Sequence, residues 1–231
     1  HLSIRRQRQM CIRDRPNVDW LEIWQASLDT LNMLGGSMLF TVLFGLPLGV
    51  LLFLTGPRQM FEQKGLYAVI SLVVNVLRSV PFVILLILLI PVTVVITGTS
   101  LGVAGAIPPL VVGATPFFAR LVETALREVD RGIIEATQAM GASTRQIIFN
   151  ALLPEALPGI LAAITVTAIT LVSYTAMSGL IGGGGLGDLA VRYGYQRYQP
   201  DVMFVTVALL VVLVQILQTI GDRLVVHFSR K

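Results

Sequence analysis

The feature that most constrains this chain is a series of long stretches without any charged side chain. They cover Thr30–Pro57, Ser79–Ala119, Ala156–Gly187 and Val202–Gly221. A helix needs roughly 20 apolar residues to cross the hydrocarbon core of a bilayer, and every one of these stretches reaches that length. Because backbone groups in lipid must find their hydrogen bonds internally, the expected fold is an all-α, polytopic bundle of membrane helices. Transmembrane strands do not fit, since the apolar runs show no alternation.

The stretches resolve into five expected spans. Ser79–Ala119 is too long for one helix and contains turn signals at Pro91 and at Thr97–Ser100. A further apolar run, Gly65–Leu77, continues through Arg78 into it. The five transmembrane helices are therefore predicted at 26–54, 66–90, 102–126, 158–181 and 202–226. Only 13% of the residues are charged, against about 25% in a soluble domain, which excludes a soluble enzyme.

The excess of positive charge lies in one short segment. The formal net charge is +4, and residues 1–15 alone hold five arginines against one aspartate. Residues 1–19 are therefore interpreted as a basic arm outside the core, and residues 20–231 as one transmembrane domain. The arm has three interpretations: a tail on anionic lipid, a start or tag that is not native, or a nucleic-acid arm. No nucleic-acid partner is expected for the rest of the chain, because residues 16–231 hold twelve basic and twelve acidic residues and are neutral.

The sidedness of Lys and Arg predicts the orientation, because cytoplasmic loops carry the excess of these residues. The loops at 55–65 and 120–157 and the C-terminal tail together carry nine basic residues, whereas the loops at 91–101 and 182–201 carry two. This places the C-terminus in the cytoplasm. With five spans, the N-terminus then lies outside, although the arginines of the arm oppose that assignment.

The loop at about 130–155, between the third and fourth spans, predicts two short cytoplasmic helices. Asp130 is a good N-cap for the first, and Gly141 stands where a left-handed residue ends a helix. The apolar face of the first helix is expected at Ile133, Ile134, Thr137 and Met140. Ser143–Gln146 has the pattern of a capping box for the second helix, and Pro154 ends or kinks it. Such a hairpin either packs on its own bundle or docks into a groove of a partner.

This loop resembles the EAA loop of the membrane subunits of bacterial ABC importers. The matching residues are Glu135, Ala136, Gly141, Leu153 and Pro154, and the departures are Thr137 and Ala151. The resemblance implies that the matching residues couple the permease to an ATPase. It also implies an inner-membrane protein that works as a homodimer with two cytoplasmic ATPase subunits and an extracytoplasmic substrate-binding protein.

The resemblance covers the chain from about Trp20 to its end and is strongest to permeases of methionine importers. It is carried by five further stretches: Arg78–Phe82, Gly98–Ser100, Leu152–Gly159, Tyr174–Met177 and Gly221–Arg223. The resemblance implies a pathway for methionine that opens alternately to the two sides. The alternatives are a permease for another small amino acid or organic ion, a channel or secondary transporter working alone, and a membrane scaffold that transports nothing.

The chain itself offers no site for a cofactor or a metal. It contains no Gly-x4-Gly-Lys-Ser/Thr sequence, so ATP and Mg²⁺ are expected on the partner ATPase, and this chain is not expected to be an enzyme. Its only cysteine is Cys11, and its two histidines are terminal. Gly182–Gly187 matches a dinucleotide fingerprint but follows an apolar helix instead of a strand, which favours a flexible outward loop. The resemblance places Gly184, Gly185 and Gly187 of this loop on the face that meets the binding protein.

Three residues within the spans are candidates for the pathway. Arg78 is a charge inside a span, where a charge is costly and marks a pathway or an ion pair; Glu123 is the partner to consider. With Ser79 and Pro81 next to it, the helix is expected to kink. Tyr174 and Met177 lie one turn apart and either close a pore or pack in the bundle. Two ion pairs are expected at helical spacing, Glu123 with Arg127 and Asp188 with Arg192.

Overall fold

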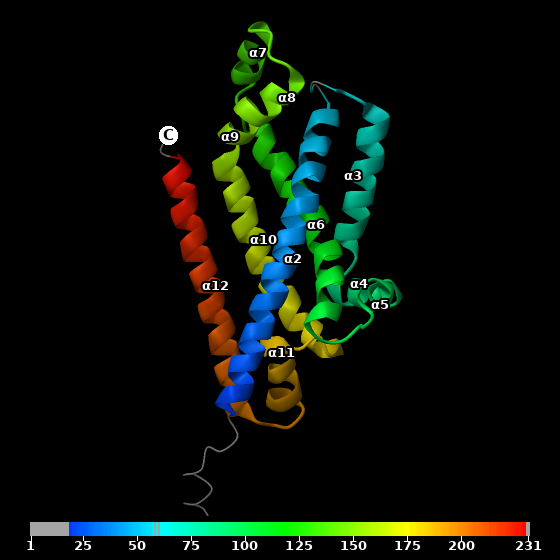
Figure 1. Ribbon diagram of the computed structural model, residues 1–231, viewed down its shortest axis with the longest axis vertical. Helices are drawn as coiled ribbons and strands as arrows, with labels where there is room; N and C mark the ends of the chain where they lie inside the picture. Colours follow the sequence, from blue (N-terminus) through cyan, green and yellow to red (C-terminus); the bar gives the residue numbers. More distant parts are fainter. Residues whose placement is uncertain (1–18, 58, 60, 230–231) are drawn as a thin grey trace, which may run out of the picture.

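The structure is a computed structural model that describes residues 19–57, 59 and 61–229, so of the predicted arm at 1–19 only Asp19, the N-cap of α2, is among the described residues. In this part of the chain every regular element is helical (Figure 1). The elements are α2 (Trp20–Thr55), α3 (Lys64–Ser79), α4 (Phe82–Leu88), α5 (Ile90–Thr97), α6 (Gly102–Arg127), α7 (Arg131–Ala139), α8 (Thr144–Gln146), the π-helical η1 (Ile147–Leu152), α9 (Leu153–Glu155), α10 (Leu157–Ser178), the 3₁₀ turn η2 (Gly179–Ile181), α11 (Gly185–Leu189), the π-helical η3 (Ala190–Tyr195) and α12 (Pro200–Ser229).

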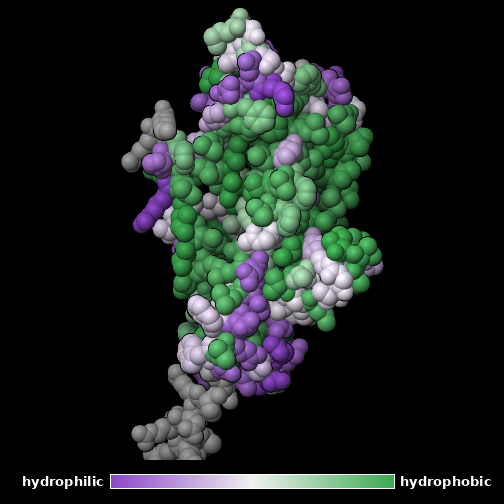
Figure 2. Space-filling view, in the orientation of Figure 1, coloured by the Kyte–Doolittle hydropathy of each residue, from purple (hydrophilic) through white to green (hydrophobic). Residues whose placement is uncertain are grey.

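The spans confirm the predicted membrane bundle. Four helices are long and apolar enough to cross a bilayer: α2, α6, α10 with its extension η2, and α12. A fifth span exists if the bent pair of α3 and α4 is counted as one. The space-filling view shows an apolar belt around the middle of the molecule, with hydrophilic surface gathered towards both ends (Figure 2). This is the distribution that a membrane-spanning protein requires, because the bilayer interior solvates apolar side chains.

The span predicted over 66–90, with a kink near Pro81, is two helices that meet at a sharp bend. The helix α3 ends at Ser79, and the next helix, α4, departs from it at 102°. Proline at position 81 has no N–H group to donate and disfavours helical geometry in the residue before it. Val80 accordingly is extended, with φ −75° and ψ 125°. The expected kink is therefore a sharp turn, and Arg78 lies in the last turn of α3.

The centre of the bundle is the contact between α2 and α6, the most extensive between any two elements. Glycines make the close approach possible. A Cβ added at Gly49 would lie 2.7 Å from the carbonyl oxygen of Ala119 and from the side chain of Val122. Phe118, Val122 and Leu126 of α6 are fully buried and join residues of α2, η1 and α10 in one apolar cluster. A second apolar cluster, which includes Met33, Leu110 and Leu171, joins α2, α4, α6 and α10, so the core consists of more than one part.

The last described helix, α12, is the least enclosed of the long helices. Only Val202, Thr206 and Gly221 of its residues are buried, and it packs mainly on α10, η3 and α11. Gly221 lies so close to Thr165 that an added Cβ would overlap that side chain. Much of the remaining α12 surface is made of exposed apolar side chains, such as Phe204, Val211, Val212 and Ile216. In a bilayer, lipid or another protein must therefore cover it.

Candidate functional site: a helical hairpin, an arginine cavity and a glycine turn

The predicted hairpin is present at one end of the bundle, beside the end of α12 (Figure 1). Asp130 caps α7 by accepting a hydrogen bond from the backbone N–H of Gly132 at 2.8 Å. Gly141 has φ +80°, so the left-handed turn predicted at this position is confirmed. Side chains other than Gly, Asn and Asp rarely adopt this conformation. The reversal of the chain after α7 therefore depends on Gly141.

The second arm of the hairpin begins as predicted and continues differently. Ser143 and Gln146 form the capping box that starts α8. The helix then widens into the π-helical segment η1 before Pro154. Proline in this position removes the backbone donor that would bond to Asn150, which suits a local departure from α-helical bonding. The second half of the hairpin thus continues through α9 towards α10. The helix changes its geometry near Pro154 and does not end there.

The hairpin splits its apolar side chains between two surfaces. Ile134, Ile148 and Leu153 pack against the bundle core. Met140 and Phe149 instead are 77% and 63% exposed. Ile133, Ile134 and Thr137 of the predicted apolar face are half-buried, whereas Met140 follows the end of α7 at Ala139 and is exposed. Phe149 was missed by the sequence analysis, although a large aromatic residue in a polar loop is a usable signal.

Most of the residues that match the EAA pattern lie on the free side of the hairpin. Glu135, Ala136, Gly141 and Pro154 are exposed, and Leu153 is half-buried. A hollow of about 360 Å³ opens between the two arms of the hairpin, and its lining includes Met140 and Gly141. The hairpin therefore presents both projecting apolar side chains and a recess, which is the kind of surface that fits against another protein.

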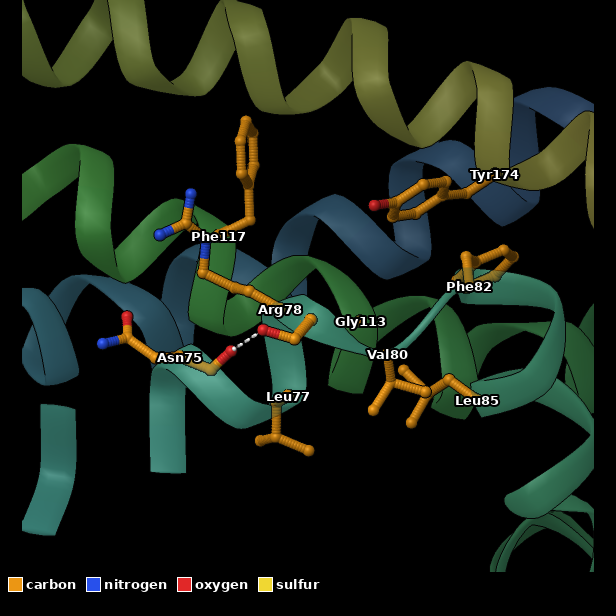
Figure 3. A pocket seen from close by; sticks show the side chains of 10 residues that line it. Asn75, Leu77, Arg78, Val80, Phe82, Leu85, Gly113, Phe117 and Tyr174 are labelled. Atoms are coloured by element: carbon orange, nitrogen blue, oxygen red, sulfur yellow. Dashed lines mark hydrogen bonds between the residues drawn. The ribbon is translucent and has the colours of Figure 1, made fainter. Parts of the chain in front are cut away.

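A second hollow, also about 360 Å³ in volume, lies where α3 turns into α4 (Figure 3). Arg78 lies in it, with its guanidinium carbon 5.8 Å from the centre of the Phe117 ring. Tyr174 of α10 reaches the same hollow and stacks on Phe82 of α4. The lining comprises Asn75, Leu77, Arg78, Ser79, Val80, Phe82, Leu85, Gly113, Phe117 and Tyr174. We call this space the arginine cavity.

The three predicted pathway residues are only partly brought together. Arg78 and Tyr174 line the arginine cavity, but Met177 does not belong to its lining. Met177 is 42% exposed on the outside of α10. Tyr174 and Met177 therefore do not act on one space within a single copy of the chain. Whether they close a pore between copies remains a prediction.

Glu123 of α6 is buried and has two arginine partners on its own helix. Arg120 donates to its carboxylate at 2.6 Å and Arg127 at 2.7 Å, so the predicted pair with Arg127 is confirmed. In the described part of the chain, no ion pair joins Glu123 to Arg78, and that suggestion is wrong. Tyr67 also donates to Glu123, at 3.2 Å. The carboxylate is thus fully engaged by α3 and α6.

Arg120 extends this network to α3. Its guanidinium donates to the hydroxyl of Ser71 at 2.7 Å and to the side-chain oxygen of Asn75 at 3.0 Å. The contact of Arg120 with Ser71 and Asn75 has no signal in the sequence, because the residues lie more than 40 positions apart. The network holds the first half of the bent span against α6.

The glycine-rich segment after α10 is a packed turn. Gly185 and Gly187 are buried, and a Cβ added at Gly187 would overlap the backbone of Ala176. The backbone N–H of Leu186 donates to the hydroxyl of Thr30 on α2 at 2.9 Å. The interpretation as a flexible loop therefore does not hold. Gly184 has φ +79°, which glycine adopts without strain.

The helical segment after this turn ties back to the start of α2. Arg192 of η3 pairs with Asp188 at 2.9 Å, as predicted, and also contacts Glu22 of α2 at 3.4 Å. The end of the molecule opposite the hairpin is thus a structured surface built from α2, α11 and η3. Whether a binding protein docks on it remains a prediction.

Comparison with known proteins identifies the family. Residues 45–231 match the family described as the binding-protein-dependent transport system inner membrane component. A probable D-methionine transport system permease protein of Vibrio cholerae is 52% identical over 87% of this chain and 89% of its own length. A methionine import system permease protein of Bacillus subtilis is 51% identical over 90% of this chain and 93% of its own length.

Solved structures agree with the sequence relatives. A chain of the inward-facing methionine ABC transporter MetNI has a TM-score of 0.89 and 48% identity, covering 91% of this chain and 99% of that one. An amino acid ABC transporter solved with histidines has a TM-score of 0.67 at 20% identity, which is a likeness of fold alone. The chain therefore belongs to the family of binding-protein-dependent transport system inner membrane components.

Proposed function

We propose that this chain is the permease subunit of an ATP-driven importer for methionine. The observation that carries the proposal is an identity of about half of all residues, over most of the chain, with relatives named as methionine permeases from two bacteria. The membrane-spanning bundle and the projecting hairpin support it, because an importer needs both a pathway through the bilayer and a contact with its energy source.

The coupling surface in this proposal is the free side of the hairpin. Met140 and Phe149 project from it, and Glu135, Ala136 and Gly141 lie on the same exposed hairpin. Exposed apolar side chains at the rim of a recess are typical anchors in protein interfaces. The partner is an ATPase subunit that binds ATP and Mg²⁺, so the chemistry of hydrolysis lies outside this chain.

The complete transporter in this proposal contains two copies of the chain and two ATPase subunits. A single copy is a thin bundle, and a two-fold axis between copies supplies a pathway that both line. Binding of ATP draws the two hairpins together and opens the pathway outward; loss of the products resets it. The apolar, open face of α12 is compatible with contacts to lipid or to the second copy.

The orientation in this proposal has the N-terminus outside and the hairpin in the cytoplasm. The hairpin and the end of α12 lie at the same end of the molecule (Figure 1), and the segments predicted to be cytoplasmic carry nine basic residues in the sequence. The surface built from α11 and η3 then faces outward. It is the proposed docking place of the substrate-binding protein, and the turn with Gly184, Gly185 and Gly187 supports it from beneath.

The test is uptake of labelled methionine into liposomes that contain the chain together with its ATPase and binding protein. ATP-dependent accumulation of methionine is the expected result. Phe149→Ser should lower uptake at least severalfold without lowering the melting temperature, because this side chain is exposed. Leu153→Ser, which disturbs a half-buried contact with the core, is the matched variant that lowers stability.

Three results would overturn parts of the proposal. Accumulation that proceeds without ATP or without the ATPase would indicate a channel or secondary transporter working alone. Uptake of another small amino acid or organic ion in preference to methionine would retain the permease and change its substrate. If Phe149→Ser, Met140→Ser and the double variant all leave uptake unchanged, the hairpin has no coupling role.

A further inference from the structure

Arg78 is a charged side chain within the membrane-spanning part of the chain that no carboxylate neutralises. In the described residues it takes part in no ion pair, and its ring contact is with Phe117. Glu123, the buried carboxylate suggested by the sequence as a partner for Arg78, forms its ion pairs with Arg120 and Arg127. Arg78 is an exposed side chain, and an unpaired charge in a membrane span is costly unless it faces a cavity or a pathway.

The other polar groups of the arginine cavity are also donors. The side-chain oxygen of Asn75 accepts from Arg120, which leaves the NH₂ group of the same amide as a donor. The Ser79 hydroxyl is used up, because it donates to the backbone carbonyl of Asn75 at 2.8 Å. Tyr174 extends its hydroxyl into the cavity from the opposite side (Figure 3). A space lined by a guanidinium and by amide and phenol donors, without a carboxylate, is complementary to an anion.

The rest of the wall is apolar and aromatic. Phe82, Phe117 and Tyr174 come from α4, α6 and α10, so three different helices close one side of the cavity. A volume of about 360 Å³ is at the lower end of the range for sites of small molecules. Such a space holds one small molecule with an anionic group at one end and an apolar body at the other.

We propose that the arginine cavity binds the α-carboxylate of the transported amino acid, with Arg78 as its counter-ion and the aromatic wall against its side chain. This inference rests on the proposed function, because a transported molecule must have access to the cavity. The charge-assisted bond from a guanidinium to a carboxylate supplies orientation as well as affinity. The site lies at the bend between α3 and α4, so movement of that bend alters it.

The reactivity of a cysteine introduced at position 79 tests the charge of the cavity directly. The experiment uses the complete transporter in lipid with Cys11→Ser and Ser79→Cys, and compares an anionic with a cationic methanethiosulfonate reagent. The anionic reagent is expected to react about tenfold faster, which corresponds to about 1.4 kcal/mol. Arg78→Gln should bring the ratio of rates close to one, and Arg78→Lys should keep the preference.

Two controls separate the cavity from the general charge of the protein. Arg223→Gln removes an exposed arginine from α12 and should leave the ratio unchanged. The exposed residue Gln138 of α7 serves as a reporter elsewhere: Gln138→Cys should show a ratio that does not respond to Arg78→Gln. An unchanged ratio at Ser79→Cys in Arg78→Gln would overturn the proposal.

Protection by ligand tests the carboxylate. Methionine should slow the modification of Ser79→Cys severalfold, whereas methioninamide, which lacks the carboxylate, should not. Arg78→Gln should abolish protection by methionine. Equal protection by both compounds, or no protection by methionine or by any other transported amino acid, would overturn the site.

Uptake in the same preparation distinguishes this inference from the proposed function. If methionine is not taken up but another amino acid both enters and protects, the substrate is wrong and the carboxylate site stands. If methionine is taken up while Arg78→Gln changes neither protection nor the reagent ratio, the function stands and the site is wrong. If Arg78→Gln does not fold, the proposal is still tested on the protein that retains Arg78. The tests are then the ratio of the two reagent rates at Ser79→Cys and the difference in protection between methionine and methioninamide.

Discussion

The ring of Tyr174 on α10 stacks on the ring of Phe82 on α4, with centroids 4.2 Å apart and planes inclined by 1°. The two residues are far apart in the sequence, and Phe82 is the first residue of the helix that follows the bend. Their contact therefore fixes the outgoing arm of the broken span against an unbroken membrane helix. It also forms one wall of the arginine cavity.

Replacement of this ring pair should separate packing from the phenol hydroxyl. Phe82→Leu should lower stability by about 0.5–1.5 kcal/mol or more, because it removes the aromatic partner of Tyr174. Tyr174→Phe should keep the stack and lower stability less. The measurement is the melting temperature of the purified transporter. A larger loss for Tyr174→Phe than for Phe82→Leu would contradict the assignment of the contact to ring stacking.

Glu123→Gln should destabilise the contact between α3 and α6. The change leaves Arg120 and Arg127 without their shared carboxylate, and loss of one partner from a buried pair costs about 3–5 kcal/mol. Glu128→Gln, at the exposed end of the same helix, is the matched control and should have little effect. Thermal unfolding of the two variants under one condition gives the answer. Equal melting temperatures would show that the network contributes nothing to stability.

Two glycine substitutions should differ sharply in outcome. Gly187→Ala places a methyl group into the backbone of Ala176 and should prevent correct packing of α11 on α10. At Gly35 no atom lies within 4 Å of an added methyl group. In the middle of a helix, alanine gives a more stable protein than glycine by about 0.5–1 kcal/mol. The yield of monodisperse protein after solubilisation checks both. Normal yield of Gly187→Ala would mean that the turn relaxes easily.

Gly141→Ala should affect transport more than stability. No atom lies within 4 Å of an added Cβ, so only the left-handed backbone is penalised, by about 1–2 kcal/mol. The strain should shift the tip of the hairpin, which is remote from the core, and reduce methionine uptake per ATP hydrolysed. Gly141→Asn, which tolerates the conformation better, should keep more of the uptake. A loss of uptake in both variants to the same extent would point away from backbone geometry.

The elements that depend on neighbouring residues were predictable from the sequence. The capping residues Asp130 and Ser143, the turn at Gly141 and the pair of Asp188 with Arg192 all rest on spacings of a few residues, and the structure confirms them. The membrane helices rest on charge-free length, and α6 matches its predicted limits within one residue. Local rules suffice where the partner is one helical turn away.

The features that depend on distant residues were not predictable. Arg78 is the one charge that hydropathy places well inside a span, but the contacts of Arg120 with Ser71 and Asn75 on another helix have no signal in the sequence. Hydropathy also does not show the direction in which a helix runs. The prediction therefore placed α3 and α4 in one span, although the two helices meet at 102°. The burial of Gly185 and Gly187 depends on the close approach of α2 and α10, which a glycine run alone does not reveal.

The limited burial of α12 bears on the order in which the protein assembles during synthesis. This helix leaves the ribosome after the rest of the described chain, and none of its side chains belongs to the cluster around Phe118 and Leu126. All members of this cluster are therefore in place in the chain before residues 200–229 are made. The late helix then closes over α10, where the missing side chain of Gly221 leaves room for Thr165.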